Sequence, residues 1–175
     1  MKKNEGKLTG FLSYTLATTE RQVDGINRGD WYPSRFDQRH NFSITGFYKL
    51  SKRWDLSANF VYNTGTPATF PTSRLEQQGY VFPHNTEDSR NNFRIPDYHR
   101  LDISATLKPK DSDKKWKGEW VFSIYNVYNR RNPFSIFFRQ ETGRPPVSGP
   151  INTEAIKLSV IGNFIPSVSY NFKFQ

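Results

Sequence analysis

The side chains best suited to chemistry in this sequence are its three histidines, His40, His84 and His99. They lack the spacing of metal ligands on one element, and the chain contains no H-E-x-x-H sequence. It also contains neither a G-x-S-x-G motif for a nucleophilic serine nor a phosphate-binding loop. Because it has no cysteine, thiolate metal sites and disulfides are excluded. The sequence therefore predicts a protein that is not an enzyme and that holds no metal or cofactor.

Three carboxylates, Glu76, Glu87 and Asp88, belong to a long polar stretch of the chain. They could bind a cation or a substrate, but a solvated loop is the default interpretation of such a segment. His40 and His99 precede two comparable alternating stretches, so we expect them to share a structural role near the ends of two strands.

The composition combines many aromatic rings with low mean hydropathy. Aromatic residues make up 16% of the chain, as 15 Phe, 9 Tyr and 4 Trp, while the mean hydropathy is -0.76. A soluble domain of that polarity seldom carries so many rings. A lipid-facing β-barrel does, because it shows apolar side chains to the membrane and polar ones to its lumen on alternate residues.

The net charge of +9 would draw the chain towards a nucleic acid or an anionic membrane surface. Its basic residues are scattered, however, and they cluster only between candidate strands, at Lys52, Arg53, Lys108, Lys110, Lys114, Lys115 and Lys117. Solvated turns near a membrane surface explain this pattern, so no nucleic-acid partner is expected.

The chain contains no run of about 18 apolar residues, so no transmembrane helix is expected. Met1 to Gly6 is basic but is not followed by an apolar stretch, so it does not read as a signal peptide. For a protein of the outer membrane this predicts a fragment whose upstream part is missing. The prediction is one domain over residues 1–175.

Strict alternation of apolar and polar residues is strongest at the C-terminal end. The apolar positions there are all even-numbered: Ile156, Leu158, Val160, Gly162, Phe164, Pro166, Val168, Tyr170, Phe172 and Phe174. This predicts one strand whose even residues face lipid and whose odd residues face the lumen, with a bulge or an unpaired position at Pro166. Weaker alternation predicts further strands over 8–16, 42–50, 54–62, 101–107 and 120–124, which makes about six antiparallel strands in all.

The connections between these strands alternate in length. Residues 51–53 and 111–117 are short turns, whereas 20–36, 67–96 and 140–154 are long and rich in Gly, Pro, Asn and Arg. Outer-membrane barrels join strands by short periplasmic turns and long external loops. We therefore expect the C-terminus on the periplasmic side, with Tyr14, Tyr48, Trp54, Trp116 and Trp120 near strand ends at the membrane interfaces.

The last six residues resemble the terminal signal by which outer-membrane proteins are recognised by the barrel-assembly machinery. Tyr170, Phe172 and Phe174 alternate with polar residues, although the chain ends on Gln175 rather than on an aromatic. The alternative is an amphipathic final strand without a signalling role.

Several segments together resemble the C-terminal part of the barrel of a TonB-dependent receptor of the kind abundant in Bacteroidetes. They span nearly the whole chain: Gly6–Gly10, Ser13–Leu16, Trp31–Pro33, Phe36–Asn41, Asn63–Pro67, Arg94–Asp102, Tyr125–Pro133 and Pro166–Phe174. The resemblance implies an all-β fold, an antiparallel transmembrane β-barrel segment made of about six C-terminal strands of a barrel of about 22 strands. The family's signal peptide, TonB-contacting box and plug domain are absent from these residues.

The resemblance also implies a function and partners. The whole receptor imports a nutrient such as a siderophore, glycan or peptide across the cell outer membrane, and this segment forms barrel wall and external loops. Expected partners are outer-membrane lipid, the remainder of the barrel and its plug, the TonB energising complex acting through the plug, and the barrel-assembly machinery. A surface lipoprotein is left open as a further partner.

Two pairs of residues open predicted strands and are expected to point into the lumen: Arg39 with Asn41, and Arg100 with Asp102. They could contact the plug, or they could form interstrand ion pairs within the wall, which contribute little individually. Arg130, Arg131 and Asn132 follow the fifth strand, beside Asn126 and Asn129. There a structural role in holding an external loop is favoured over contact with substrate.

Two other protein classes compete with this interpretation. A small complete outer-membrane barrel or adhesin needs at least eight strands to close, whereas about six are visible. A soluble all-β carbohydrate-binding module would bury its aromatic residues between two sheets.

Overall fold

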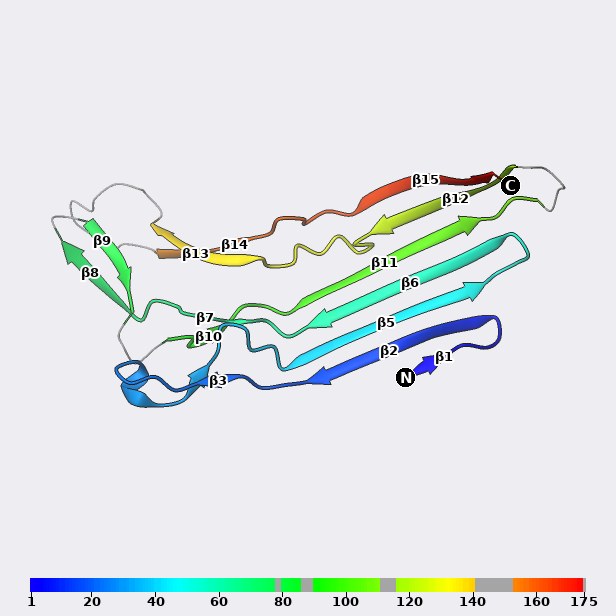
Figure 1. The fold of residues 1–175 in the computed structure, drawn as a ribbon. Coiled ribbons are helices and arrows are strands. Elements are labelled where there is room, and N and C mark those ends of the chain that lie inside the picture. The colour runs from blue at the N-terminus through cyan, green and yellow to red at the C-terminus, as the bar shows by residue number, and fades with distance from the viewer. Residues whose placement is uncertain (78–79, 86–89, 111–115, 141–152, 175) are drawn as a thin grey trace.

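The computed structural model describes residues 1–77, 80–85, 90–110, 116–140 and 153–174, and its largest element is one antiparallel sheet (Figure 1). The seven strands lie in the order β1 (Lys2–Lys3), β2 (Leu8–Leu16), β5 (His40–Lys49), β6 (Trp54–Asn63), β11 (Tyr98–Leu107), β12 (Trp116–Tyr125) and β15 (Ile165–Phe174). The six long strands are neighbours in chain order, so the sheet is a meander. The predictions of an all-β protein and of about six antiparallel strands are confirmed; the sheet is open, with β1 and β15 at its edges.

The two ends of the sheet differ. At one end, which we call the turn end, Ser51–Arg53 joins β5 to β6, and β15 also ends there (Figure 1). The N-terminus lies beside the middle of β2, because the Met1 amino group donates to the Leu12 carbonyl. The opposite end, the loop end, carries the long connections, as the alternating lengths predict. These connections contain elements that were expected to be loops: β3 (Glu20–Arg21) paired with β4 (Tyr32–Pro33), β7 (Pro67–Ala68) with β10 (Phe93–Arg94), β8 (Ser73–Gln77) with β9 (Tyr80–His84), β13 (Ser135–Gln140) with β14 (Thr153–Leu158), and the 3-10 turn η1 (Asn27–Gly29).

The strand register separates apolar from polar side chains. Ile44, for example, lies opposite Leu12 on β2 and Phe60 on β6. Because side chains opposite one another share a face, the register gathers the apolar positions on one side, the apolar face. It consists of Leu8, Leu12, Tyr14, Leu16, Phe42, Ile44, Tyr48, Trp54, Leu56, Ala58, Phe60, Tyr62, Leu101, Ile103, Ala105, Leu107, Trp120, Phe122, Ile124, Pro166, Val168, Tyr170 and Phe172.

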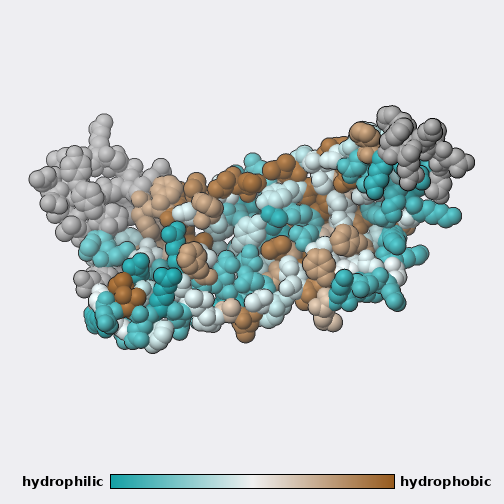
Figure 2. Space-filling model, viewed as in Figure 1, coloured by the Kyte–Doolittle hydropathy of each residue, from teal (hydrophilic) through white to brown (hydrophobic). Residues whose placement is uncertain are grey.

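The other side of the sheet, the polar face, carries mostly Ser, Thr, Asn and charged residues. Two examples of its contacts are the hydrogen bond from Thr45 Oγ1 to Asn59 Oδ1, at 2.8 Å, and the hydrogen bond between the Ser57 and Ser104 hydroxyls, at 2.7 Å. In Figure 2 hydrophilic residues cover much of the sheet turned to the viewer. Phe11, Phe47 and Ile165 depart from the pattern and are exposed there.

The apolar face is not packed against another layer of the described chain. Tyr32, at the loop end, is the one buried hydrophobic residue among those described, at 5% exposure. By contrast Val168 and Phe172, on the apolar face, are 60% and 62% exposed. A soluble sheet buries one face in a core, so these side chains require a partner outside the described residues.

The prediction of one continuous strand over 156–174 is wrong. Residues 153–158 form β14, which pairs with β13 outside the main sheet, and β15 begins only at Ile165. Between these two strands the backbone bonds to asparagine side chains of the loop end instead of to a neighbouring strand. Asn129 Oδ1 accepts from the Phe164 N–H at 3.1 Å, and Asn126 Nδ2 donates to the Asn163 carbonyl at 3.5 Å. The alternating row of apolar residues therefore belongs to two elements.

Pro166 does not form the predicted bulge. The register of β12 with β15 runs without interruption from the Trp116 and Phe174 pair to the Tyr125 and Ile165 pair, and Pro166 lies opposite Ile124. β15 is an edge strand of the described sheet, where a missing N–H is tolerated.

Across the described ranges, the chain forms no helix of the length and apolarity needed to cross a membrane.

Candidate functional site

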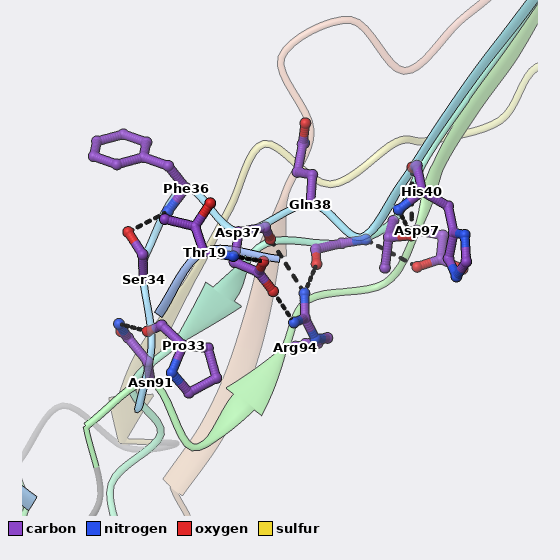
Figure 3. Close-up of polar contacts among 12 residues, drawn as sticks. Thr19, Pro33, Ser34, Phe36, Asp37, Gln38, His40, Asn91, Arg94 and Asp97 are labelled. Carbon is purple, nitrogen blue, oxygen red and sulfur yellow. Dashed lines mark hydrogen bonds and ion pairs between the residues drawn. The ribbon is translucent and has the colours of Figure 1, made fainter. Parts of the chain in front are cut away.

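Asp37 and Arg94 form the most buried charged pair at the loop end (Figure 3). The Asp37 side chain is 1% exposed and pairs with the Arg94 guanidinium through Oδ2. Its Oδ1 accepts the backbone N–H of Thr19 at 2.7 Å, while Arg94 Nη1 donates to the Asp37 and Gly65 carbonyls, each at 3.1 Å. Two side chains therefore join the loop before β5, the loop after β6 and strand β10.

The surroundings of Asp37 favour its charged form. Burial of the carboxyl acts to raise its pKa, but hydrogen bonds from Arg94 and Thr19 and the positive charges of Arg94 and Arg39 outweigh burial and lower the pKa overall. Asp37 thus stabilises the fold as a carboxylate, and sequence reasoning noted it only as part of a charged stretch before β5.

Asp97, just before β11, connects that strand to the end of β6 and to the loop that follows β6. Its carboxylate accepts from the Tyr62 hydroxyl at 2.7 Å and from the Gly65 N–H at 2.9 Å. These hydrogen bonds lower its pKa, with burial opposing them and the charge of Arg130 assisting. Gly65 is required here because an added Cβ would lie 1.7 Å from the Ile95 carbonyl oxygen.

The asparagine-rich stretch after β12 forms a cluster of hydrogen bonds. We call Asn126, Asn129, Arg130 and Asn132 the asparagine knot. Asn126, buried and at φ 56°, donates from Nδ2 to the Arg130 carbonyl at 3.0 Å and accepts from the Arg130 N–H at 3.1 Å. Asn132 bonds both backbone groups of His99, at 3.1 and 2.9 Å, so it acts like a strand neighbour of β11. Arg130 also donates from Nη2 to the Asp97 carbonyl at 3.0 Å, whereas Arg131 is exposed. That these residues hold an external loop stays a prediction.

The predicted lumenal residues mostly lie on the polar face. Arg100 pairs with Asp102 two residues along β11, at 3.0 Å, and its Nη1 donates to the hydroxyls of Tyr98 and Tyr125 at 2.9 and 2.6 Å. The pair lies within one strand rather than between strands. Asn41 lies in β5 on the same face, and Arg39 is exposed just before that strand. Contact of these residues with a plug stays a prediction.

The two histidines at the starts of β5 and β11 do have matching roles. His40 Nδ1 lies 2.8 Å from the Tyr14 hydroxyl, and His99 Nδ1 lies 2.7 Å from the Tyr128 hydroxyl. Each pair sits at the loop end of the apolar face. His84 ends β9, Glu76 lies in β8, and Glu87 and Asp88 fall outside the described residues.

The proposed assembly residues lie on β15. Tyr170 and Phe172 are exposed on the apolar face, where the Tyr170 ring packs 4.8 Å from that of Trp120. Phe174 lies opposite Trp116 in the strand register. Recognition by the assembly machinery stays a prediction.

Two adjoining cavities open at the loop end. The first, of about 550 Å³, lies among β3, β4, β7 and β13, and arginines 21, 35 and 90 line it. The second, of about 430 Å³, shares Thr66, Ile95 and Phe134 with the first and reaches Tyr98 and Tyr125 of the polar face. No group of three potential metal ligands occurs among the residues with described positions. The loop end therefore presents arginines, amides and hydroxyls to these two cavities.

Sequence reasoning missed this cavity and the Asp37 and Arg94 pair. Both depend on which long loops meet in space, and a local pattern carries no such information. The charged residues Arg94 and Asp97 on either side of Pro96 were the available signal.

Comparison with known proteins gave no match to the chain, whether with family models, with curated proteins or with solved structures.

Proposed function

We propose that the chain forms wall and external loops of an outer-membrane transporter of the TonB-dependent receptor type, as about six C-terminal strands of a larger barrel. The observation that carries the proposal is the sheet with two unlike faces: an apolar face that no described residue covers and a polar face of Ser, Thr, Asn and paired charges. Lipid on one side and water on the other is the environment in which both faces are satisfied.

The uncovered apolar face argues against the soluble carbohydrate-binding module. A sandwich places a second sheet about 10 Å from the first, over its apolar side chains. Here the short hairpins that could serve as a second layer lie beyond the loop end of the sheet instead (Figure 1). Fully burying one such Phe, Leu or Ile side chain contributes about 1.5–3 kcal/mol, so a whole uncovered face is a large cost in water.

The dimensions of the apolar face fit a bilayer. From Trp54, near the turn end, to Tyr62, near the loop end, the strand rises by about 27 Å at about 3.4 Å per residue. A strand tilt of about 40° reduces this to about 21 Å, close to the apolar band of about 25 Å on outer-membrane barrels. Rings border the band at both ends: Tyr48, Trp54, Trp120 and Tyr170 at the turn end, and Tyr14, Tyr62 and Tyr128 at the loop end.

The open edges of the sheet support a larger barrel rather than a small one. Strands β1 and β15 each have one neighbour in the described sheet, and β1 is only two residues long. Unpaired strand edges are not tolerated in lipid, so the remaining strands of the barrel pair with them. The polar face then lines the lumen, where the plug sits and through which the TonB complex acts, and the loop end meets the imported nutrient.

Pulse labelling of the full-length protein tests location and assembly together. The wild type should appear in the outer-membrane fraction, whereas Phe172→Ala with Phe174→Ala should reduce the inserted fraction several-fold, because it removes two rings from the terminal strand. Lys173→Ala is the matched control and should insert like the wild type. Recovery of the wild type in a soluble fraction would contradict the proposal, and equal insertion of the double variant would remove the assembly signal.

A further inference from the structure

The first cavity at the loop end is unusual in its charge. Among the described residues that line it, Arg21, Arg35 and Arg90 are basic and none is acidic. In the described part of the chain, none of these three forms an ion pair, in contrast to Arg94 and Arg100. All three side chains are exposed, so solvent screens their mutual repulsion, but their positive charges together attract an anion to the cavity.

The three arginines come from separate parts of the chain that the fold brings together. Arg21 ends β3, Arg35 follows β4, and Arg90 precedes β10. Two hydrogen bonds hold the loop that carries Arg90. The Arg90 N–H donates to Asn27 Oδ1 at 2.9 Å, and Asn91 Nδ2 donates to the Pro33 carbonyl at 2.7 Å. These two hydrogen bonds join the loop of Arg90 to the segment between β3 and β4 and to β4 itself, and the pairing of Arg21 with Tyr32 joins β3 to β4. None of these contacts uses a guanidinium group.

A second observation points to a ligand with hydroxyl groups. Asn85 lines the same cavity, and its buried Oδ1 has no hydrogen-bond partner in the described structure. A buried acceptor left unpaired costs roughly 1–3 kcal/mol. A hydroxyl donor on a ligand would satisfy this oxygen if the Asn85 amide turned it towards the cavity.

The cavity also communicates with the polar face. Thr66, Ile95 and Phe134 line both cavities, and the second cavity reaches Tyr98 and Tyr125 on the strands. A ligand bound among the arginines thus lies at the top of the polar side of the sheet, away from the apolar face. That position favours a soluble ligand over a lipid headgroup, although a soluble sugar and a lipid headgroup can each carry a sugar phosphate.

We propose that Arg21, Arg35 and Arg90 form a binding site for a soluble acidic sugar, one that carries a carboxylate or a phosphate together with free hydroxyl groups. Arginine suits this ligand because its planar fork binds carboxylate and phosphate oxygens in pairs. An acidic sugar would then be the substrate class of the proposed transporter. Only the fate of the bound sugar rests on that function, since binding is measured independently of transport.

Calorimetric titration of the full-length protein in detergent tests the site with three probes: glucuronate, glucose 6-phosphate and glucose. The charged sugars should bind at least about tenfold more tightly than glucose, and more weakly as salt is added. Arg21→Gln with Arg35→Gln should weaken the charged probes about tenfold. The control, Lys52→Gln with Arg131→Gln, removes the same charge from exposed positions outside the cavity and should stay within about twofold of the wild type.

Equal binding of charged and neutral sugars, or unchanged binding in the cavity variant, would overturn the inference. Vesicles with and without lipid A distinguish the two sources of phosphate. If the wild type and the cavity variant differ only in their binding to vesicles that contain lipid A, and not in their binding of the soluble sugars, the occupant is a lipid headgroup. The proposal of a soluble sugar is then overturned. Failure of the proposed function has a different readout, recovery of the protein outside the outer membrane.

Discussion

The loop end and the sheet invert the usual relation between burial and polarity. At the loop end four of the buried side chains are polar, namely Ser34, Asp37, Asn126 and Asn132, and each has hydrogen-bond partners within the chain. On the sheet the exposed side chains are apolar, among them Val168 and Phe172. These four polar side chains are satisfied by groups of the chain itself, whereas the apolar face of the sheet depends on its surroundings. Changes at the loop end should therefore act on stability in any solvent, and changes on the sheet should act through the environment that covers it.

The largest effect is expected from a charge on the apolar face. Ile44→Arg, in the middle of β5, should destabilise the protein in a membrane by about 2–4 kcal/mol, because arginine near the bilayer midplane carries that cost on a barrel. Ser43→Arg is the matched control, since it places the same charge on the adjacent residue of the polar face. Unfolding by urea in lipid vesicles measures both, and equal destabilisation would erase the distinction between the two faces.

A smaller effect is expected at the Asp37 and Arg94 pair. Asp37→Asn leaves Arg94 without its carboxylate and should lower the free energy of unfolding by about 1–3 kcal/mol, less than for a fully buried pair because Arg94 is partly exposed. Urea unfolding measures the loss. Arg131→Gln, an exposed charge at the same end of the sheet, should change little.

The same pair predicts a pH dependence. The pKa of Asp37 is lower in the folded protein than in the unfolded one, so its contribution is complete above about pH 4 and is lost as the pH falls through the lowered value. The Asp37→Asn variant should lose less stability on acidification than the wild type. An identical slope in the two proteins would show that the carboxylate does not contribute in this way.

The smallest effect concerns backbone geometry in the asparagine knot. Asn129 adopts φ 57°, and its Oδ1 accepts the Phe164 N–H. Asn129→Ala loses that hydrogen bond and strains the backbone, which together should cost roughly 1–2 kcal/mol. Asn129→Gly loses the bond but not the geometry, so it should be the milder change by about 1 kcal/mol. Thermal unfolding of the two variants compares them, and a milder alanine variant would contradict this account.

The sheet could be predicted from the sequence more fully than the loop end. Alternation is a local pattern with a fixed period, so it revealed the strands and their two faces, as in Phe42 to Tyr48. It failed at 156–174, because the residues that interrupt the strand, Asn126 and Asn129, lie far upstream in the chain. The Arg21, Arg35 and Arg90 cavity was missed for the same reason. The contact between Asn126 and Arg130 could be anticipated because these residues are close in sequence, whereas the contact between Asn132 and His99 could not.

Spin labels at two adjacent residues of β15 test the central claim most directly. Val168 lies on the apolar face and Ser169 on the polar face, and both are exposed in the described structure. In the full-length protein in lipid vesicles, the label at residue 168 should be accessible to oxygen dissolved in the bilayer, and the label at residue 169 to a water-soluble relaxation agent. Equal accessibility, or the reverse assignment, would contradict the account of a sheet with one face in lipid and the other in water.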